Sequence, residues 1–508
     1  MALIIVSLPL SADASNVEDA LVVGIQSSKT ISLRPLAPVE RDMLSVFDLV
    51  YDSLVVINDD YMPELSLADS ITNNNGKTWT IRLKENLQFS DGSPLTAYDV
   101  VATAEAIIAK AGSENTADQG YYYNLKYFVD KISAKNELTI ELRAERAYYG
   151  VWYALTFPVL PASQVNADNP LGSGPYMVQS FEPGSSLELV PNPYWWQGQP
   201  QVKSIFFEMY SKASEVIEAY EYARVDAIFT RSIASAQYKG GTSNLALDYR
   251  TNQLECLLMN HSAFPTNNQS VREAIRYLID VDKIASQIYN GMVERTDTPF
   301  VNGTWMYNEG LTSYFRTDPA RALELLDAEG WSDTNDDGIL DRPNDEGKSV
   351  MLAMDLYVYE EPDNDVRVET ANLIADTLNS YGFSVTVKTM SFAQVQEELS
   401  KGNFDMCLAS FAMDICPDAG FMLMNYNTGN YSRYRSQTMT DLCTSLRKQV
   451  EQADYQRVLY QIQEQFAKDC PFICMFYRSG TVLTRRMYTV TRDVREGELL
   501  KGIEFFRN

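Results

Sequence analysis

The chain has 508 residues, more than one hydrophobic core normally serves, so we expect two or three domains. Lysine and arginine number 42 against 68 aspartates and glutamates, and the resulting net charge of −26 disfavours binding to nucleic acid or to anionic lipid. A single histidine, His261, excludes a zinc site built on several histidines, and a serine hydrolase would have to use this residue as its base.

The first 18 residues predict a signal peptide. An apolar stretch runs from Ala2 to Leu10 and is followed by Ala12-Asp13-Ala14, a small-x-small cleavage pattern, although the basic residues that usually precede such a stretch are missing. The stretch is too short to span a bilayer. We therefore expect a protein secreted to the periplasm or the outer face of the cell membrane, with a disordered or core-packed N-terminus as the alternative.

Strand-like and helix-like segments alternate along the chain, which indicates an α/β protein whose sheets are covered by helices. Residues 78–83 (TWTIRL) alternate as a half-buried strand does, and Thr96 is placed to cap a helix that begins near Ala97. Gly172 and Gly174 are expected to fix a turn at a domain crossing. The later predicted elements are a strand at 254–260, a helix at 271–289, helix-glycine-strand units at 373–390 and 397–413, a helix at 454–470 and a strand at 471–477.

Three segments carry a family resemblance. Residues 89–103 (FSDGSPLTAYDVVAT), 172–200 and 257–284 resemble, in this order, motifs of the solute-binding proteins of peptide-type ABC transporters (family 5), and the similarity extends from about residue 20 to the C-terminus. The resemblance implies a bilobed periplasmic-binding-protein fold of the large three-domain type (class II, cluster C-like) with a hinge of two crossing strands. Its expected parts are domain I (19–52, 170–252 and 476–508), domain II (53–169) and domain III (253–475), with 254–260 and 471–477 as the crossing strands.

Residues 409–420 (ASFAMDICPDAG) place a carboxylate at the end of a predicted strand. In peptide-binding members of this family, a Trp-x-x-Asp segment ends such a strand, and its aspartate receives the α-ammonium of the ligand. Here Phe411 stands at the tryptophan position and Asp414 at the aspartate position. An ammonium that is buried with its ligand needs a carboxylate partner. The resemblance therefore implies that Asp414 contacts the ligand; capping of the next turn is the alternative.

Two departures from the family pattern bear on the ligand. Asp418 is displaced by one position from the usual second acid, and residues 360–362 (Glu-Glu-Pro) stand where dipeptide-binding relatives often have an arginine and a proline for the ligand carboxylate. The carboxylate-binding arginine is then sought among Arg367, Arg433 and Arg435; otherwise the ligand is not a short zwitterionic peptide.

Aromatic side chains form a second group of candidates, because their faces stack on sugars and on peptide side chains. Tyr431 and Tyr434 follow the Asp414 segment where family members line the pocket, and Met413 lies within that segment. Further aromatic residues, for which ordinary packing is the more frequent role, are Tyr121, Tyr122, Tyr123, Tyr148, Tyr149 and Trp152.

A third candidate is a calcium site. Asp333, Asn335, Asp337 and Asp341 follow the spacing of the first nine positions of an EF-hand loop with glycine at the sixth, but the twelfth position is Asn344 instead of a bidentate glutamate. The family often has a similar turn without a metal. Structural calcium is thus the one cofactor considered, and a metal-free turn is the alternative.

The cysteines show no CxxC pairing, so buried thiols are the default interpretation for all six: Cys256, Cys407, Cys416, Cys443, Cys470 and Cys474. Some relatives join the neighbourhoods of Cys256 and Cys416 by a disulfide, and the resemblance implies the same pairing here as an alternative to free thiols.

As a whole, the resemblance implies a monomeric, non-catalytic receptor that closes on an oligopeptide or dipeptide between its lobes and delivers it to an ABC permease. The same fold with an oligosaccharide or another small polar solute is the alternative. A hydrolase that uses His261 is a remote one, and a chaperone or signalling receptor on this fold is also open.

Overall fold

The structure is a computed structural model of the chain, and it describes residues 20–112, 120–239, 245–344, 346–361, 364–485, 488 and 494–506. The expected signal peptide, residues 1–18, lies outside this range, as does Pro362. Within the described ranges, no helix combines the length and the apolar character that crossing a membrane requires.

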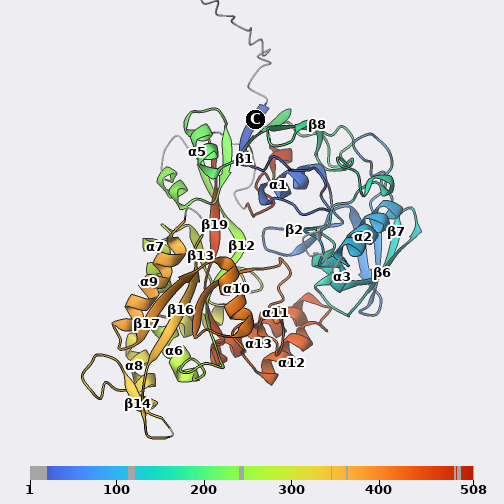
Figure 1. Cartoon of the computed structure of the whole chain (residues 1–508). Helices are drawn as coiled ribbons and strands as arrows, with labels where there is room; N and C mark the ends of the chain where they lie inside the picture. Colours follow the sequence, from blue (N-terminus) through green and yellow to red (C-terminus); the bar gives the residue numbers. More distant parts are fainter. Residues whose placement is uncertain are drawn as a thin grey trace, which may run out of the picture.

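The centre of the molecule is one mixed β-sheet (Figure 1). Its strands are β1 (Ala20–Gln26), β8 (Tyr176–Glu182), β9 (Ser186–Pro191), β10 (Ser204–Tyr210), β11 (Ala227–Thr230), β12 (Leu245–Met259), β13 (Val293–Arg295), β16 (Ala353–Tyr359), β17 (Ser384–Met390), β18 (Met406–Ala412) and β19 (Phe472–Thr484). The order is β17-β16-β18-β12-β19-β11-β1-β10-β9-β8, and β13 pairs with β19 beside this path.

Three smaller sheets accompany it in the described part of the chain. One has the order β4-β5-β7-β6, and the two others are hairpins, β2–β3 and β14–β15. Their strands are β2 (Val55–Ile57), β3 (Pro63–Leu65), β4 (Ala68–Asn73), β5 (Thr78–Leu83), β6 (Val129–Asn136), β7 (Thr139–Ala144), β14 (Asp341–Pro343) and β15 (Ser349–Met351). The strand predicted at 78–83 is therefore confirmed as β5.

The α-helices are α1 (Arg41–Val50), α2 (Ala97–Ala111), α3 (Leu125–Phe128), α4 (Val151–Ala154), α5 (Ala213–Glu221), α6 (Gln269–Leu278), α7 (Val281–Gln287), α8 (Pro319–Ala328), α9 (Val366–Asn379), α10 (Phe392–Lys401), α11 (Gly420–Leu423), α12 (Gln437–Leu446) and α13 (Gln452–Asp469). Short 3₁₀ helices are η2 (Ala162–Gln164), η3 (Ile233–Tyr238), η4 (Glu309–Phe315) and η5 (Ile503–Phe505). Helix α5 packs on β1, β10 and β11, and α9 packs on β16 and β17.

Two long strands, β12 and β19, connect the two halves of the main sheet (Figure 1). Residues 245–250 pair with 479–484, next to β11, and residues 254–258 pair with 472–477, next to β18. The ladder is irregular between these two stretches, at Arg250–Leu254. The crossing strands predicted at 254–260 and 471–477 are thus strands, but both are longer than predicted because each continues past the irregularity into the other half.

Local sequence explains where the helices begin and end. Thr96 and Asp99 form the predicted capping arrangement at the start of α2, with the Thr96 N–H donating to Asp99 Oδ2 at 2.8 Å. The single helix predicted at 271–289 is wrong. It is divided into α6 and α7, because the Asp280 side chain accepts the Lys283 N–H at 2.9 Å and so caps a new helix.

Candidate ligand-binding site

Asp414 lies two residues beyond the end of β18. Ala412 is the last residue paired with β12, the Met413 N–H donates to the Asn252 carbonyl at 2.8 Å, and the chain then turns. The Cys416 N–H donates to Asp414 Oδ1 at 2.9 Å, so this oxygen does cap the turn. Oδ2 accepts a hydrogen bond from the Asn124 side chain, which comes from the start of α3. Asp414 therefore lies where two distant parts of the chain meet.

The Asp414 carboxyl is exposed to water and is nevertheless partly desolvated. Its side chain is accessible to solvent, yet burial among surrounding protein raises its pKa, against the lowering effect of its hydrogen bonds. Tyr121 shows the same combination: it is 53% exposed, and burial raises its pKa. Groups that combine an exposed side chain with a desolvated environment face a narrow, water-accessible space enclosed by protein.

Further acidic and aromatic groups surround this space. After burial, the charge of Asp414 is the next cause that raises the pKa of both Tyr121 and Tyr123, which places all three near one another. On α1, Asp48 is also exposed and lies near Tyr122, and burial followed by the charge of Glu498 raises the Asp48 pKa well above the usual value, which favours its neutral form. The negative charge of Asp414 therefore remains the feature that favours a cationic group on a solute.

The aromatic residues next to Asp414 pack against one another. Phe411 is 8% exposed, and its ring centroid lies 6.0 Å from that of Phe421 and 6.2 Å from that of Tyr431. Tyr431 and Met413 are half-buried at the edge of this cluster. Phe411 therefore packs beneath the segment that carries Asp414. Tyr431 and Met413 are the residues of this cluster that keep exposed surface for contact with a solute.

Arg367 and Tyr434 are placed elsewhere. Arg367 is 1% exposed, and its guanidinium donates to Glu255 at 2.7 Å and to Glu361 at 3.1 Å. Tyr434 is 3% exposed, and its hydroxyl donates to Asp469. In this conformation neither side chain is exposed to a solute, because Arg367 is held by its two ion pairs and Tyr434 is packed in the core.

The two other candidate arginines, Arg433 and Arg435, are only partly free. Arg433 donates to the Ser400 carbonyl at 2.6 Å, and the Arg435 guanidinium lies 4.9 Å from the centre of the Tyr426 ring. Neither is brought next to Asp414 by a contact between described residues. Recognition of a ligand carboxylate by an arginine stays a prediction.

A second set of contacts joins the same two parts of the chain. The Tyr148 hydroxyl, between β7 and α4, donates to Asp418 Oδ2 at 2.9 Å, and Arg447 holds both oxygens of that carboxylate at 2.6 and 3.1 Å. The Tyr149 N–H donates to the Gln449 carbonyl at 2.7 Å. The acid displaced from the family pattern, Asp418, thus belongs to an ion pair that docks Tyr148.

Sequence reasoning missed Asn124, Asp48 and Arg447, and it named Tyr148 and Asp418 without pairing them. The paired residues lie hundreds of positions apart, and nothing in local spacing reveals such a pairing. Among the missed residues, Asn124 carried a signal, because it directly follows the three tyrosines at 121–123.

The carboxylates of the candidate calcium loop accept hydrogen bonds from nearby protein groups. Asp333 accepts the N–H groups of Asp337 and Gly338 at 3.2 and 2.9 Å, and the 2% exposed Asp341 accepts the hydroxyls of Thr334 and Ser349 at 2.7 and 2.9 Å. In the described part of the chain, no three or more His, Cys, Asp or Glu side chains are grouped to hold a metal ion. Binding of calcium through Asp333, Asn335, Asp337 and Asp341 stays a prediction.

All six cysteines are buried free thiols in this structure. Cys416 Sγ lies 3.5 Å from the Tyr148 hydroxyl, whereas Cys256 lies opposite Cys474 in the β12–β19 ladder. The disulfide between Cys256 and Cys416 stays a prediction.

His261 is engaged in the fold. Its Nε2 lies 2.9 Å from the Pro471 carbonyl, which can only accept, so Nε2 carries the proton. Burial, with a further contribution from the Arg272 charge, lowers the His261 pKa to about 4. This histidine is neutral at ordinary pH, and its Nε2 N–H is bound to the backbone of the fold.

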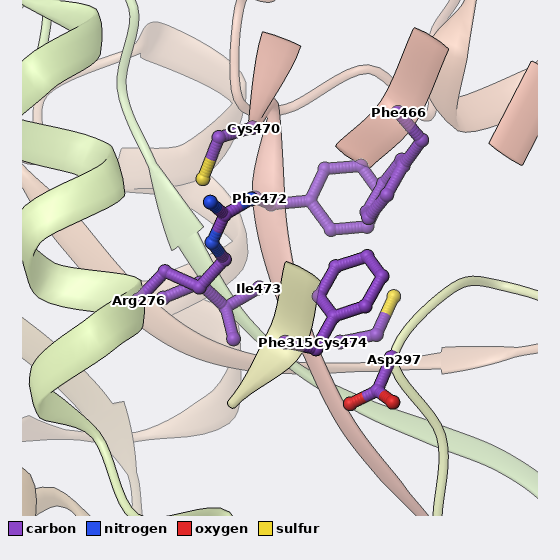
Figure 2. A pocket seen from close by; sticks show the side chains of 8 residues that line it. All are labelled: Arg276, Asp297, Phe315, Phe466, Cys470, Phe472, Ile473 and Cys474. Carbon is purple, nitrogen blue, oxygen red and sulfur yellow. The ribbon is translucent and has the colours of Figure 1, made fainter. Parts of the chain in front are cut away.

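A small cavity that Asp414 does not line is shown in Figure 2. Its empty volume is about 190 Å³, partly open to solvent, and it is lined by Arg276, Asp297, Phe315, Phe466, Cys470, Phe472, Ile473 and Cys474. It is smaller than the usual site of an organic ligand and holds none of the candidate residues. We therefore place the candidate site at Asp414 and Tyr121.

Two features together are typical of a bilobed solute-binding protein. Two long strands cross a mixed sheet, and charged and aromatic groups from distant segments face an enclosed space. Residues 62–433 match the family described as "Bacterial extracellular solute-binding proteins, family 5 Middle". The chain belongs to this family, whose members bind solutes and are not enzymes.

Known relatives cover nearly the whole chain. It is 22% identical to the oligopeptide-binding protein AppA of Bacillus subtilis, over 90% of this chain and 86% of AppA. It is 26% identical to the nickel-binding periplasmic protein of Escherichia coli, over 61% of each chain. The crystal structure of the ABC transporter substrate-binding protein CtaP from Listeria monocytogenes superposes with a TM-score of 0.79 at 18% identity, over 96% of this chain and 98% of CtaP. The last comparison shows the fold.

Proposed function

We propose that the protein is the substrate-binding receptor of an ABC importer and that it captures a peptide with a free amino terminus between its lobes. Asp414 carries the proposal. Its Oδ1 is fixed by the turn and its Oδ2 by Asn124, while the carboxyl still faces water within a partly desolvated space. A carboxylate held in this way offers a fixed counter-charge to an α-ammonium. A relative named as oligopeptide-binding supports peptide as the cargo.

Closure of the two lobes around the peptide would allow the protein to deliver it to the permease. A solute that contacts groups from both lobes favours the closed form by the difference of its affinities for the two forms, and a permease that recognises the closed form receives loaded protein. The family description supports an extracellular location, and we propose that the protein acts there as a monomer.

The first prediction concerns the ammonium. Wild-type protein should bind a free-amine peptide, identified by native mass spectrometry of a defined peptide mixture, more tightly than its N-acetylated form. Asp414→Asn should weaken binding of the free-amine peptide by about 30-fold or more, because it leaves an ammonium without its counter-charge. Asp441→Asn, an exposed aspartate on α12, serves as the control. Equal affinities of wild type and Asp414→Asn by calorimetry would rule out the ammonium assignment.

The pH dependence has a defined sign. Binding requires the ionised carboxylate, and the pKa of Asp414 lies above 3.8, so affinity for the free-amine peptide should fall on acidification at a higher pH than an ordinary aspartate would give. Asp414→Asn should remove this step.

Native mass spectrometry of the purified protein also tests which solute it carries. Peptides should be retained by purified protein, and a bound sugar or a nickel complex without peptide would replace peptide with the alternative of another small polar solute. Nickel is included because it is named for a relative.

A further inference from the structure

Two cysteines of the crossing strands face each other. Cys256 on β12 and Cys474 on β19 are register partners in the antiparallel ladder, and both belong to the same buried cluster, which places their side chains on one face of the sheet. They are 0% and 3% exposed. Burial raises the pKa of the Cys474 thiol, and interaction with the Cys256 thiol raises it further. Directly opposed residues of such a ladder have the separation that a disulfide requires.

We propose that Cys256 and Cys474 form a disulfide when the protein is in an oxidising compartment. The two thiols lose two protons and two electrons and form one S–S bond, while a small disulfide oxidant such as oxidised glutathione accepts them and is released as two thiols. A family described as extracellular meets such conditions.

Cys474 lines a small cavity together with Phe315 and Asp297 (Figure 2). The cavity is too small to admit a molecule of oxidised glutathione, so the oxidant reaches the pair when this part of the sheet opens locally.

The positions of Cys256 and Cys474 in the chain determine how a disulfide between them would affect stability. A bond between residues 256 and 474 closes a loop that contains α6 to α13 and β13 to β18, so it restricts the unfolded state of that whole part of the chain. The pair lies beyond the ladder irregularity at Arg250–Leu254 and directly at a second one, between Glu255 and Cys256. Oxidation should therefore join the strands at the second irregularity and leave the first, at Arg250–Leu254, without a covalent link.

The test uses full-length reduced protein incubated with oxidised glutathione, then denatured and alkylated. We expect a loss of about 2 Da, a cross-linked peptide pair containing Cys256 and Cys474, four thiols still alkylated, and a rise in melting temperature of about 10 °C. Cys407→Ala, a buried cysteine on β18 opposite Leu258, should oxidise like wild type, whereas Cys474→Ala should show neither the mass loss nor the rise. Six alkylated thiols, a mixed disulfide with glutathione alone, or a cross-link between other cysteines in the wild type would overturn the proposal.

Discussion

Asp52 shows how one side chain couples folding to pH. Its Oδ2 is enclosed at the end of α1, and the indole N–H groups of Trp195 and Trp196 and the Ser173 hydroxyl surround it without completing hydrogen bonds of ordinary geometry. Burial raises the Asp52 pKa to about 7, despite the lowering effect of these donors. The carboxyl therefore keeps its proton in the folded protein over a range in which the unfolded chain has lost it.

This difference predicts a loss of stability with rising pH. The pKa of Asp52 is higher in the folded protein than in the unfolded chain, so its contribution to stability is fully present below pH 3.8. This contribution is lost as pH rises to about 7, and the free energy of unfolding then falls by roughly 2–4 kcal/mol. Asp52→Asn resembles the protonated form and should match wild type near pH 4 and exceed it at pH 8. Urea unfolding at several pH values measures this, with the exposed Asp60→Asn as control. Parallel profiles for wild type and Asp52→Asn would contradict it.

Single residues also show how far sequence reasoning reaches. The turn assigned to Gly172 and Gly174 is required by close approach, because a Cβ on Gly172 would lie 1.9 Å from the Val50 carbonyl oxygen and one on Gly174 2.6 Å from the Leu49 carbonyl oxygen. Capping of α2 by Thr96 was predictable for another reason: its partner Asp99 is close in sequence. The roles of Arg367 and Tyr434 were not, because Glu255 and Asp469 reach them only through the tertiary fold.

At the scale of elements, α3 and α4 are held against α11–α13 by tyrosines. Tyr148 stacks on Phe128 with ring centroids 5.6 Å apart, and its hydroxyl reaches Asp418 and, at 3.2 Å, the Tyr455 hydroxyl. These contacts involve no solute. They join these elements independently of whatever Asp414 binds.

Tyr148→Phe tests this contribution. The ring and its stacking remain, but the hydrogen bonds are lost, which should lower the free energy of unfolding by about 1–2 kcal/mol. Affinity for the ligand should fall about tenfold, because a contact made only on closure adds to the population of the closed form. Calorimetry measures the affinity, and Tyr127→Phe, a 60% exposed tyrosine of α3, is the control. An unchanged affinity in the presence of reduced stability would confine Tyr148 to folding.

Element types were predictable where the pattern is local, and element lengths were not. The helix-glycine-strand units at 373–390 and 397–413 appear as α9–β17 and α10–β18, with Gly382 and Gly402 at φ of +88° and +78°. The ends of β12 and β19 could not be predicted, because each strand is extended by partners in the opposite half of the sheet.

For the whole molecule, the family resemblance supplied the bilobed fold, and the match to family 5 confirms it. The domain boundaries at 52/53, 169/170, 252/253 and 475/476 stay a prediction. The ladder irregularity at Arg250–Leu254 lies next to the predicted crossing into the second lobe, where a sheet shared by both halves has its fewest regular pairs.

The shared sheet also determines when the chain can finish folding during synthesis. β19 lies between β12 and β11, yet it follows every other described strand in chain order, so both halves of the nascent chain wait for the same strand. A chain that ends at Cys470 should lack cooperative thermal unfolding, whereas one that ends at Phe506 should melt like the full-length protein. A protease-resistant fragment of residues 20–230 from the shorter chain would show that the first half does not wait. The order of the strands along the chain therefore makes folding of the first half depend on residues that lie about 240 positions beyond β11.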